Sequence, residues 1–202
     1  MLITIAQAYS QYTESLAEFG ADTDDAIALS EGWGDYTDSL CKEGKLTGLQ
    51  YHYCPAYGDT MPDDDLESDI EYVLQEMGVT YSCKRIDARR DGLMSDMSRH
   101  WRCNFERGSR GGFSVEFSQG DAHTQAPTEY DVLGSLMSDL TDETEFKETE
   151  FEYWCDEFGY ESDSRNAESI YRACMEITKS VRDTFSASEI DDLREMLSEA
   201  GY

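Results

Sequence analysis

Residues 101–117 read WRCNFERGSRGGFSVEF, and this stretch decides the fold class. Apolar residues alternate with polar ones on both sides of a glycine-rich centre. Alternation with a period of two is typical of strands that bury one face. Gly108–Gly112 fits a tight turn, so the stretch predicts a β-hairpin. The alternating residues are Trp101, Cys103 and Phe105, then Phe113, Val115 and Phe117.

The flanking sequence adds one strand and several helices. Val79, Tyr81 and Cys83 alternate in the same way and predict a third strand. Elsewhere, apolar residues recur every three or four positions, which predicts helices. We therefore expect an α+β fold, mostly helical, with a small three-stranded antiparallel sheet covered by the helices at 66–77 and near 129–140. The other helices are expected at residues 5–19, about 23–43, 151–158, about 163–181 and from 186 onward.

A polar stretch at residues 58–65, containing Pro62 and three consecutive acids, suggests a boundary. It predicts a helical N-terminal region at 1–58, an α+β region with the sheet at 59–142 and a helical C-terminal region at 143–202. A chain of 202 residues can also bury all of these in one compact domain.

The charge is extreme, with 44 acids against 16 bases and a net charge of −28. Residues 1–83 and 111–202 are acidic, whereas residues 84–110 hold eight of the bases. Disorder is the usual partner of such charge, but 39% hydrophobic and 12% aromatic residues suffice for a core. A halophile's composition would suit the scarce lysines but not six cysteines and thirteen tyrosines. A merely solubilising surface and a functional acidic surface both remain open.

The cysteines and the N-terminus suggest a compartment. The N-terminus lacks a basic segment followed by an apolar run, so we expect no signal peptide, and no apolar run approaches a membrane span. Six cysteines could form three disulfides in a secreted chain, but without an export signal we expect a cytoplasmic protein with reduced, mostly buried thiols at all six scattered positions. His52 and Cys54 lack a second ligand pair at zinc-like spacing.

Motifs that carry catalysis are absent from the sequence. It has no phosphate-binding loop, no nucleophile elbow and no zinc-protease motif. Only His52, His100 and His123 titrate near neutral pH. The acid-rich stretches 59–70 and 139–150 both lack the glycine at the sixth position of a calcium loop. We expect no catalytic residue, no cofactor and no dedicated metal site.

The bases at 84–110 allow two interpretations. They can decorate the solvent face and edges of the sheet and pair with the acidic helices, or they can form a small phosphate-binding patch. These bases are Lys84, Arg85, Arg89, Arg90, Arg99, Arg102, Arg107 and Arg110.

Three blocks resemble a loose family of uncharacterised proteins from bacteriophages and conjugative plasmids. The first is WCDEFGYESDSR at 154–165, continued by Ala167, Tyr171 and Cys174. The second is FSVEFSQG at 113–120 followed by 127–136, and the third is 33–41 with 53–57. The resemblance covers about two-thirds of the chain and implies a mobile-element origin and a bacterial cytoplasm, but no reaction.

A mobile element that enters a bacterium meets nucleases that bind DNA through contacts of Lys and Arg side chains with phosphates. The 44 carboxylates match at most the charge of roughly 20 base pairs of DNA. The first hypothesis is thus an anti-CRISPR or anti-restriction inhibitor that mimics nucleic acid. Its partner would be a CRISPR effector or a restriction enzyme, with no direct binding of nucleic acid or membrane. The expected contact residues are Asp63, Asp64, Asp65, Glu67, Asp69, Glu71, Glu145, Glu148, Glu150, Glu152, Glu189, Asp191, Asp192 and Glu195.

Two other hypotheses belong to different classes. An interaction module could bind a host factor through the aromatic segment Leu49–Tyr57, with charge serving solubility and steering. A metal-assisted enzyme is the third, and no motif supports it.

Overall fold

The computed structural model describes residues 1–20, 24–86, 99–119, 134, 136–138, 140–141 and 149–202. They form two compact units, Met1–Gly78 together with Ser188–Tyr202, and Val79–Ala187. We call these the first and the second unit. Their boundaries differ from the three expected regions because the last helix packs with the N-terminal residues.

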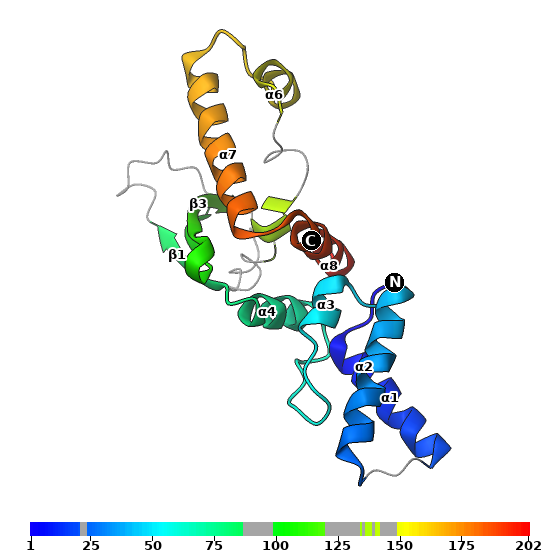
Figure 1. Cartoon of the computed structure of the whole chain (residues 1–202). Coiled ribbons are helices and arrows are strands. Elements are labelled where there is room, and N and C mark those ends of the chain that lie inside the picture. The colour runs from blue at the N-terminus through cyan, green and yellow to red at the C-terminus, as the bar shows by residue number, and fades with distance from the viewer. Residues whose placement is uncertain (21–23, 87–98, 120–133, 135, 139, 142–148) are drawn as a thin grey trace. The chain divides into compact units, whose positions relative to one another are not determined.

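The first unit is helical. Figure 1 shows α1 and α2 side by side, and we call this pair the α1–α2 hairpin. Thr4 begins α1 with a capping box, in which its hydroxyl accepts from the Gln7 amide at 3.0 Å. The helices of the unit are α1 (Ile5–Phe19), α2 (Ala26–Lys42), α3 (Gly48–His52), α4 (Leu66–Glu76) and α8 (Ala187–Ala200).

Aromatic side chains form the core of the α1–α2 hairpin. Tyr12 and Trp33 are buried with ring centroids 5.5 Å apart. The Tyr12 hydroxyl donates to the Leu29 carbonyl at 3.1 Å, and the Trp33 indole donates to the Pro55 carbonyl at 2.9 Å. Tyr57 packs on Tyr9 at 5.5 Å. Part of the aromatic segment Leu49–Tyr57 is therefore used in folding.

A buried polar network joins the starts of α1, α3 and α4. The side chain of Asp69, in α4, is fully buried, and its Oδ2 accepts from the Ile5 amide at 3.0 Å. The same oxygen accepts from Nε2 of the buried Gln50 at 2.8 Å. Gln50 Nε2 also donates to the Ile3 carbonyl at 3.0 Å, and its Oε1 accepts from the Thr47 amide at 2.9 Å. Three helices are thus tied to one carboxylate.

The second unit contains the sheet, which confirms the predicted α+β class. The strands are antiparallel in the order β1-β2-β3, and Trp101 faces Phe117 while Phe105 faces Phe113. This register places the alternating apolar residues of 101–117 on one face, as their alternation predicts. A short 3-10 turn, η1 (Gly108–Arg110), joins β2 to β3. The other elements are β1 (Thr80–Ile86), β2 (Arg99–Glu106), β3 (Gly112–Gln119), α6 (Phe151–Phe158) and α7 (Arg165–Thr184).

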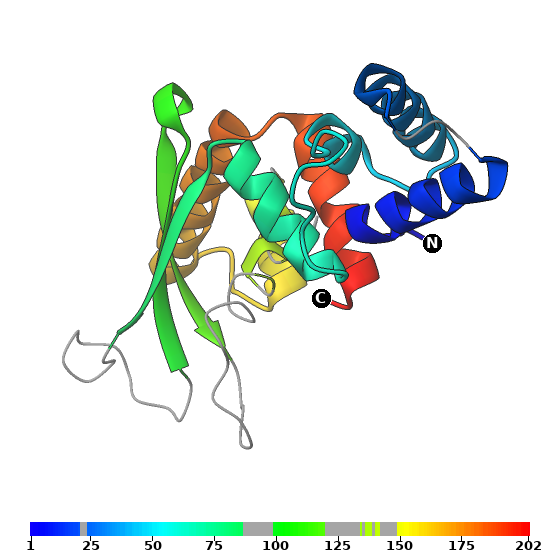
Figure 2. The ribbon, with the colours of Figure 1, turned by 90° about the horizontal axis from the view of Figure 1, so that it is seen from below.

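The helix packed on the sheet is α7, which lies along β3 in Figure 2. The helix 66–77, which was also expected to cover the sheet, is α4 and belongs to the first unit. An apolar stripe predicts burial, but it does not say which partner buries it. Most of the helix expected near 129–140 lies outside the described residues, although 134, 136–138 and 140–141 are helical.

Arg107 corrects the expectation that the bases at 84–110 lie on the solvent face. It is only 8% exposed, and its guanidinium donates to the Thr184 carbonyl at 3.0 Å. Its charge also lies 5.8 Å from the centre of the Phe185 ring. Arg107 therefore joins the end of β2 to the end of α7, while Lys84, Arg102 and Arg110 are exposed. The side chains of Arg85, Arg89, Arg90 and Arg99 lie outside the described residues.

A disulfide links Cys83 to Cys103, so the expectation of six reduced thiols was wrong for this pair. The two residues face each other across β1 and β2, with Cα atoms 4.1 Å apart. Their proximity follows from the strand register, which spacing in the sequence does not reveal. Cys41, Cys54, Cys155 and Cys174 form no disulfide.

The α6–α7 pair confirms the expected packing of the block that begins at Trp154. Trp154, Cys155, Ala167 and Cys174 form a buried cluster, and the Tyr171 hydroxyl donates to the Thr149 carbonyl at 2.5 Å. The N-cap of α7 is Ser164, close to the expected start of this helix at about residue 163. No helix among the described residues is long and apolar enough to cross a membrane.

Two glycines in α2 make a matched test of the hairpin core. A Cβ on Gly32 would collide with the Tyr12 hydroxyl, whereas one on Gly34 would meet open space. We expect Gly32→Ala to lower the free energy of unfolding by about 1–2 kcal/mol, because the Tyr12–Leu29 hydrogen bond must shift. Gly34→Ala should raise it by about 0.5–1 kcal/mol through helix propensity. Denaturant titration of both variants checks this, and equal effects would contradict the assigned Tyr12 contact.

Candidate partner-binding surface

Around the start of α4, the expected contact residues mostly serve the fold. The Asp65 carboxylate caps the helix by accepting from the Ser68 amide at 2.7 Å. Asp64 accepts from the Thr4 hydroxyl at 2.5 Å, and the half-buried Glu67 accepts from the Tyr202 hydroxyl at 3.4 Å. Asp63 and Glu71 are exposed. Acids gather here because helix N-termini present unpaired N–H groups and a positive dipole end.

Asp69 was wrongly expected on a contact surface, since it is fully buried. Burial raises the pKa of its carboxyl to about 6, although the Gln50 and Ile5 donors pull the pKa down. Its second oxygen, Oδ1, is buried without a hydrogen-bond partner. Cys54 lies near this charge, and burial followed by the Asp69 charge raises the thiol pKa to about 12. The Cys54 thiol is therefore protonated and unreactive at neutral pH.

The expected residues of α8 divide in the same way. The half-buried Asp192 accepts hydrogen bonds from the Gly48 and Leu49 amides, so it adds an acceptor at the start of α3, whose N-cap is Thr47. Burial raises the pKa of its carboxyl against the lowering effect of those donors. Asp191 pairs with Arg194 at 3.2 Å. Glu189 is half-buried and Glu195 is exposed.

The remaining expected residues, between positions 145 and 152, belong to the second unit. Glu150 and Glu152 lie at the exposed start of α6, and Glu145 and Glu148 lie outside the described residues. The fourteen expected residues are therefore divided between two units and between capping and exposed roles. Among the described ones, Asp69 is buried, and Asp65 and Asp192 accept hydrogen bonds from backbone amides.

The exposed acids of the α1–α2 hairpin were missed. Glu14 and Glu18 are four residues apart on α1, and Glu31, Asp35 and Asp38 follow at steps of four and three on α2. These steps put each set in a row along its helix. Four of the five are exposed, and Asp38 is half-exposed. The spacing was available as a signal, but the number of acids elsewhere obscured it.

The charge of this hairpin is uncompensated over most of its length. Residues 1–41 contain eight acids and no Lys, Arg or His. Lys42, the last residue of α2, pairs with Asp38, and Lys45 pairs with Glu43 at 2.8 Å. Like charges four residues apart destabilise a helix by about 0.2–0.5 kcal/mol per pair. The rows of acids therefore oppose the stability of the hairpin.

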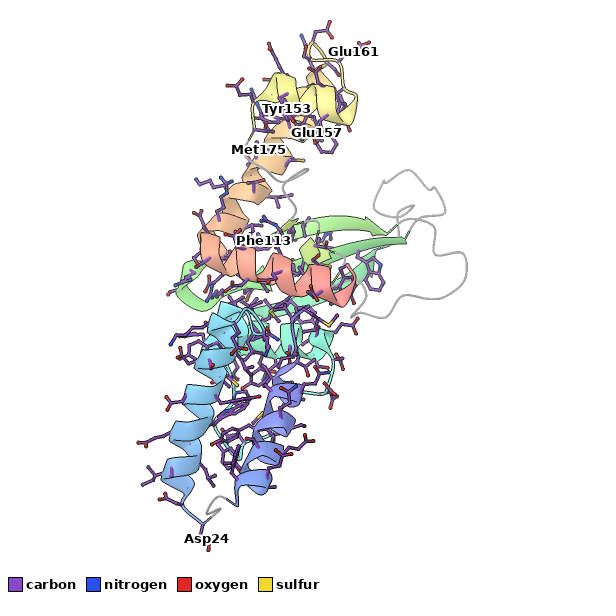
Figure 3. The ribbon with its side chains drawn as sticks, turned by 90° about the vertical axis from the view of Figure 1, so that its right-hand side faces the viewer. Asp24, Phe113, Tyr153, Glu157, Glu161 and Met175 are labelled. Atoms are coloured by element: carbon purple, nitrogen blue, oxygen red, sulfur yellow. A yellow bond between two sulfur atoms is a disulfide. The ribbon has the colours of Figure 1, made fainter. Side chains whose placement is uncertain are left out.

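The α2 row has a charge spacing comparable with that of nucleic acid. At 1.5 Å rise per residue, the three carboxylates of Glu31, Asp35 and Asp38 follow at intervals of about 6 Å and about 4.5 Å along the helix axis. One DNA strand carries about one charge per 3.4 Å of axis. Oxygen-tipped side chains extend along both helices of the hairpin in Figure 3, and Asp24 lies at its end.

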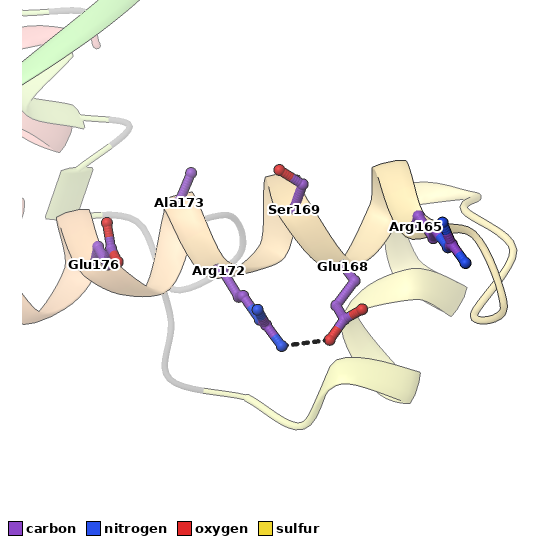
Figure 4. A pocket seen from close by; sticks show the side chains of 6 residues that line it. All are labelled: Arg165, Glu168, Ser169, Arg172, Ala173 and Glu176. Atoms are coloured by element: carbon purple, nitrogen blue, oxygen red, sulfur yellow. Dashed lines mark hydrogen bonds and ion pairs between the residues drawn. The ribbon is translucent and has the colours of Figure 1, made fainter.

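Other candidate sites in the described part of the chain are weaker. It contains no group of three or more His, Cys, Asp or Glu that could hold a metal ion. A pocket on the outer face of α7 is lined by residues of that helix alone, including Arg172, which pairs with Glu168 at 2.6 Å (Figure 4). With no wall from a second described element, it offers little to enclose a ligand.

Comparisons with protein-family models, curated proteins and solved structures found no match for this chain. The assignment of function therefore depends on the residues and their geometry.

Asp69 gives a test that separates structural acids from surface acids. Its pKa is about 6 in the fold and 3.8 in the free side chain, so between these values the folded state binds the extra proton. The contribution of Asp69 to the free energy of unfolding therefore falls as pH rises from 4 to 7, by about 3 kcal/mol. We expect Asp69→Asn to remove this part of the pH dependence, measured by urea unfolding at several pH values.

The control is Asp63→Asn, which removes one charge from an exposed position. It should leave the pH profile parallel to that of the wild type. Parallel profiles for Asp69→Asn would show that Asp69 does not titrate as a buried group.

Proposed function

We propose that this protein inhibits a bacterial defence protein by occupying its nucleic-acid-binding surface with the acidic face of the α1–α2 hairpin. The partner would be a CRISPR effector or a restriction enzyme, and a phage or plasmid origin fits the resemblance noted above. The protein itself would bind neither nucleic acid nor membrane, because its own charge repels both.

One observation carries this proposal. The hairpin presents carboxylates in rows, on two helices fixed by a buried aromatic core, with no base in residues 1–41. A rigid array of this kind can replace phosphates against Lys and Arg side chains and release the same counterions. Because the core fixes the helices, little ordering entropy opposes the binding.

The aromatic alternative has less support. Within Leu49–Tyr57, Leu49 and Pro55 are buried, and Tyr57 packs against Tyr9 and Tyr12. Tyr51 is 39% exposed and His52 is exposed. Leu49, Gln50 and Pro55 are buried, and Tyr53, Cys54 and Tyr57 are half-buried, so the segment offers a partner only part of its aromatic surface.

Competition with DNA tests the proposal. Purified CRISPR effectors and restriction enzymes, each bound to labelled duplex or guide-matched DNA, would be titrated with this protein in fluorescence-anisotropy assays. We expect displacement from at least one of them, with affinity falling roughly tenfold or more between 50 and 200 mM salt. Failure to displace DNA from any member of the panel would contradict the proposal.

A charge-neutralised hairpin identifies the surface. We expect Glu14→Gln/Glu31→Gln/Asp35→Asn to weaken competition roughly tenfold, because three exposed contacts of a few tenths to 1 kcal/mol each are lost. The matched control, Glu152→Gln/Asp156→Asn/Glu157→Gln, removes three exposed charges from α6 and should compete like the wild type. Equal weakening by both triple variants would mean that total charge, not the hairpin, determines binding.

A further inference from the structure

Two large apolar side chains are exposed at one end of the α1–α2 hairpin. Phe19 is 86% exposed and Ile27 is 74% exposed. Phe19 belongs to the apolar stripe through Tyr12 and Leu16, which predicts burial, whereas Ile27 lies four residues before Glu31 on the exposed side of α2. The fold leaves both apolar side chains uncovered.

The capping of the two helices explains this exposure. Gly20 ends α1 in the left-handed conformation at φ 61°, so Phe19 is its last residue. Asp25 caps α2 by accepting from the Ile27 and Ala28 amides at 3.2 and 3.0 Å. Ile27 is thus in the first turn of α2, and Leu29, two residues later, is the first buried residue. Residues two apart point to nearly opposite sides of a helix, so Ile27 cannot share the position of Leu29.

The charge at this end indicates what can cover it. Glu18, Asp24 and Asp25 are exposed beside the two apolar residues, and the nearest base in the sequence is Lys42. An anionic membrane would be repelled by these carboxylates. The same end of a second copy would be repelled as well. A cationic protein surface is attracted, and an apolar pocket in it would remove Phe19 and Ile27 from water.

We propose that the hairpin tip (Glu18, Phe19, Asp24 and Ile27) docks into an apolar pocket rimmed by Lys and Arg on a partner protein. Phe19 and Ile27 supply the contact that persists at high salt, and the carboxylates of Glu18 and Asp24 supply orientation and a faster encounter. This docking goes beyond the proposed function, because it requires a cationic protein partner but no nucleic-acid-binding site on it.

The test uses the full chain, labelled with ¹⁵N, and two probes of equal positive charge. One is an amphipathic helical peptide with a Leu face and a Lys face, and the other is oligolysine. We expect the amphipathic peptide to shift the amide signals of the hairpin tip and to bind roughly tenfold more weakly to Phe19→Ala/Ile27→Ala. Oligolysine should bind the variant and the wild type equally, since no charge is changed.

Tyr153→Ala is the matched control, since Tyr153 is 63% exposed among the acids of α6. It should leave the binding of both probes unchanged, and all variants should keep the unfolding temperature of the wild type. Signal shifts confined to α6, or no loss of peptide affinity in Phe19→Ala/Ile27→Ala, would overturn the proposal. Sedimentation that shows wild-type dimers lost in this double variant would also overturn it, since a second copy would then be the occupant.

Discussion

The first unit depends on the burial of one carboxylate, that of Asp69. This side chain leaves α4 and accepts hydrogen bonds from the first amide of α1 and from Gln50 of α3. Gln50 then satisfies the Thr47 amide and the Ile3 carbonyl. Helix N-termini carry unpaired N–H groups and a positive dipole end. A buried anion beside them accepts hydrogen bonds from the N–H groups and also interacts favourably with the dipole. Without it, two buried donors would lose their acceptor, each at a cost of about 1–3 kcal/mol.

The same principle recurs at the other helix starts of this unit, and it divides the acidic residues into two populations. Asp25, Asp65 and Asp192 accept from backbone amides and so cannot turn toward a partner without exposing those donors. Asp192 also attaches the C-terminal helix to α3, far away in sequence. The exposed acids of the hairpin, such as Glu14 and Glu31, have no such capping role. The net charge of −28 therefore combines acids that accept from backbone amides with acids that lie exposed on the surface.

Periodicity predicted much of the fold. Alternation in 101–117 predicted which residues of β2 and β3 share a face, because successive side chains of a strand point to opposite faces of the sheet. The long-range contacts could not be predicted, since they depend on register and packing between distant segments, as for Cys83 and Cys103. Asp69 lies three residues after Leu66 and four before Val73, on the apolar stripe of its helix. That position predicts that Asp69 is buried, whereas the sequence does not indicate which residues donate hydrogen bonds to it.

The division of the acids restricts which of them can act. A cation from a partner would have to compete with backbone N–H groups for a capping carboxylate, and breaking the cap would destabilise the helix by about 1 kcal/mol. An exposed carboxylate in a row of like charges responds in the opposite way, because a cation relieves the repulsion along the row. Binding a cationic surface therefore stabilises the α1–α2 hairpin itself. This linkage makes the hairpin rows, rather than the capping acids, the surface on which charge is available for recognition.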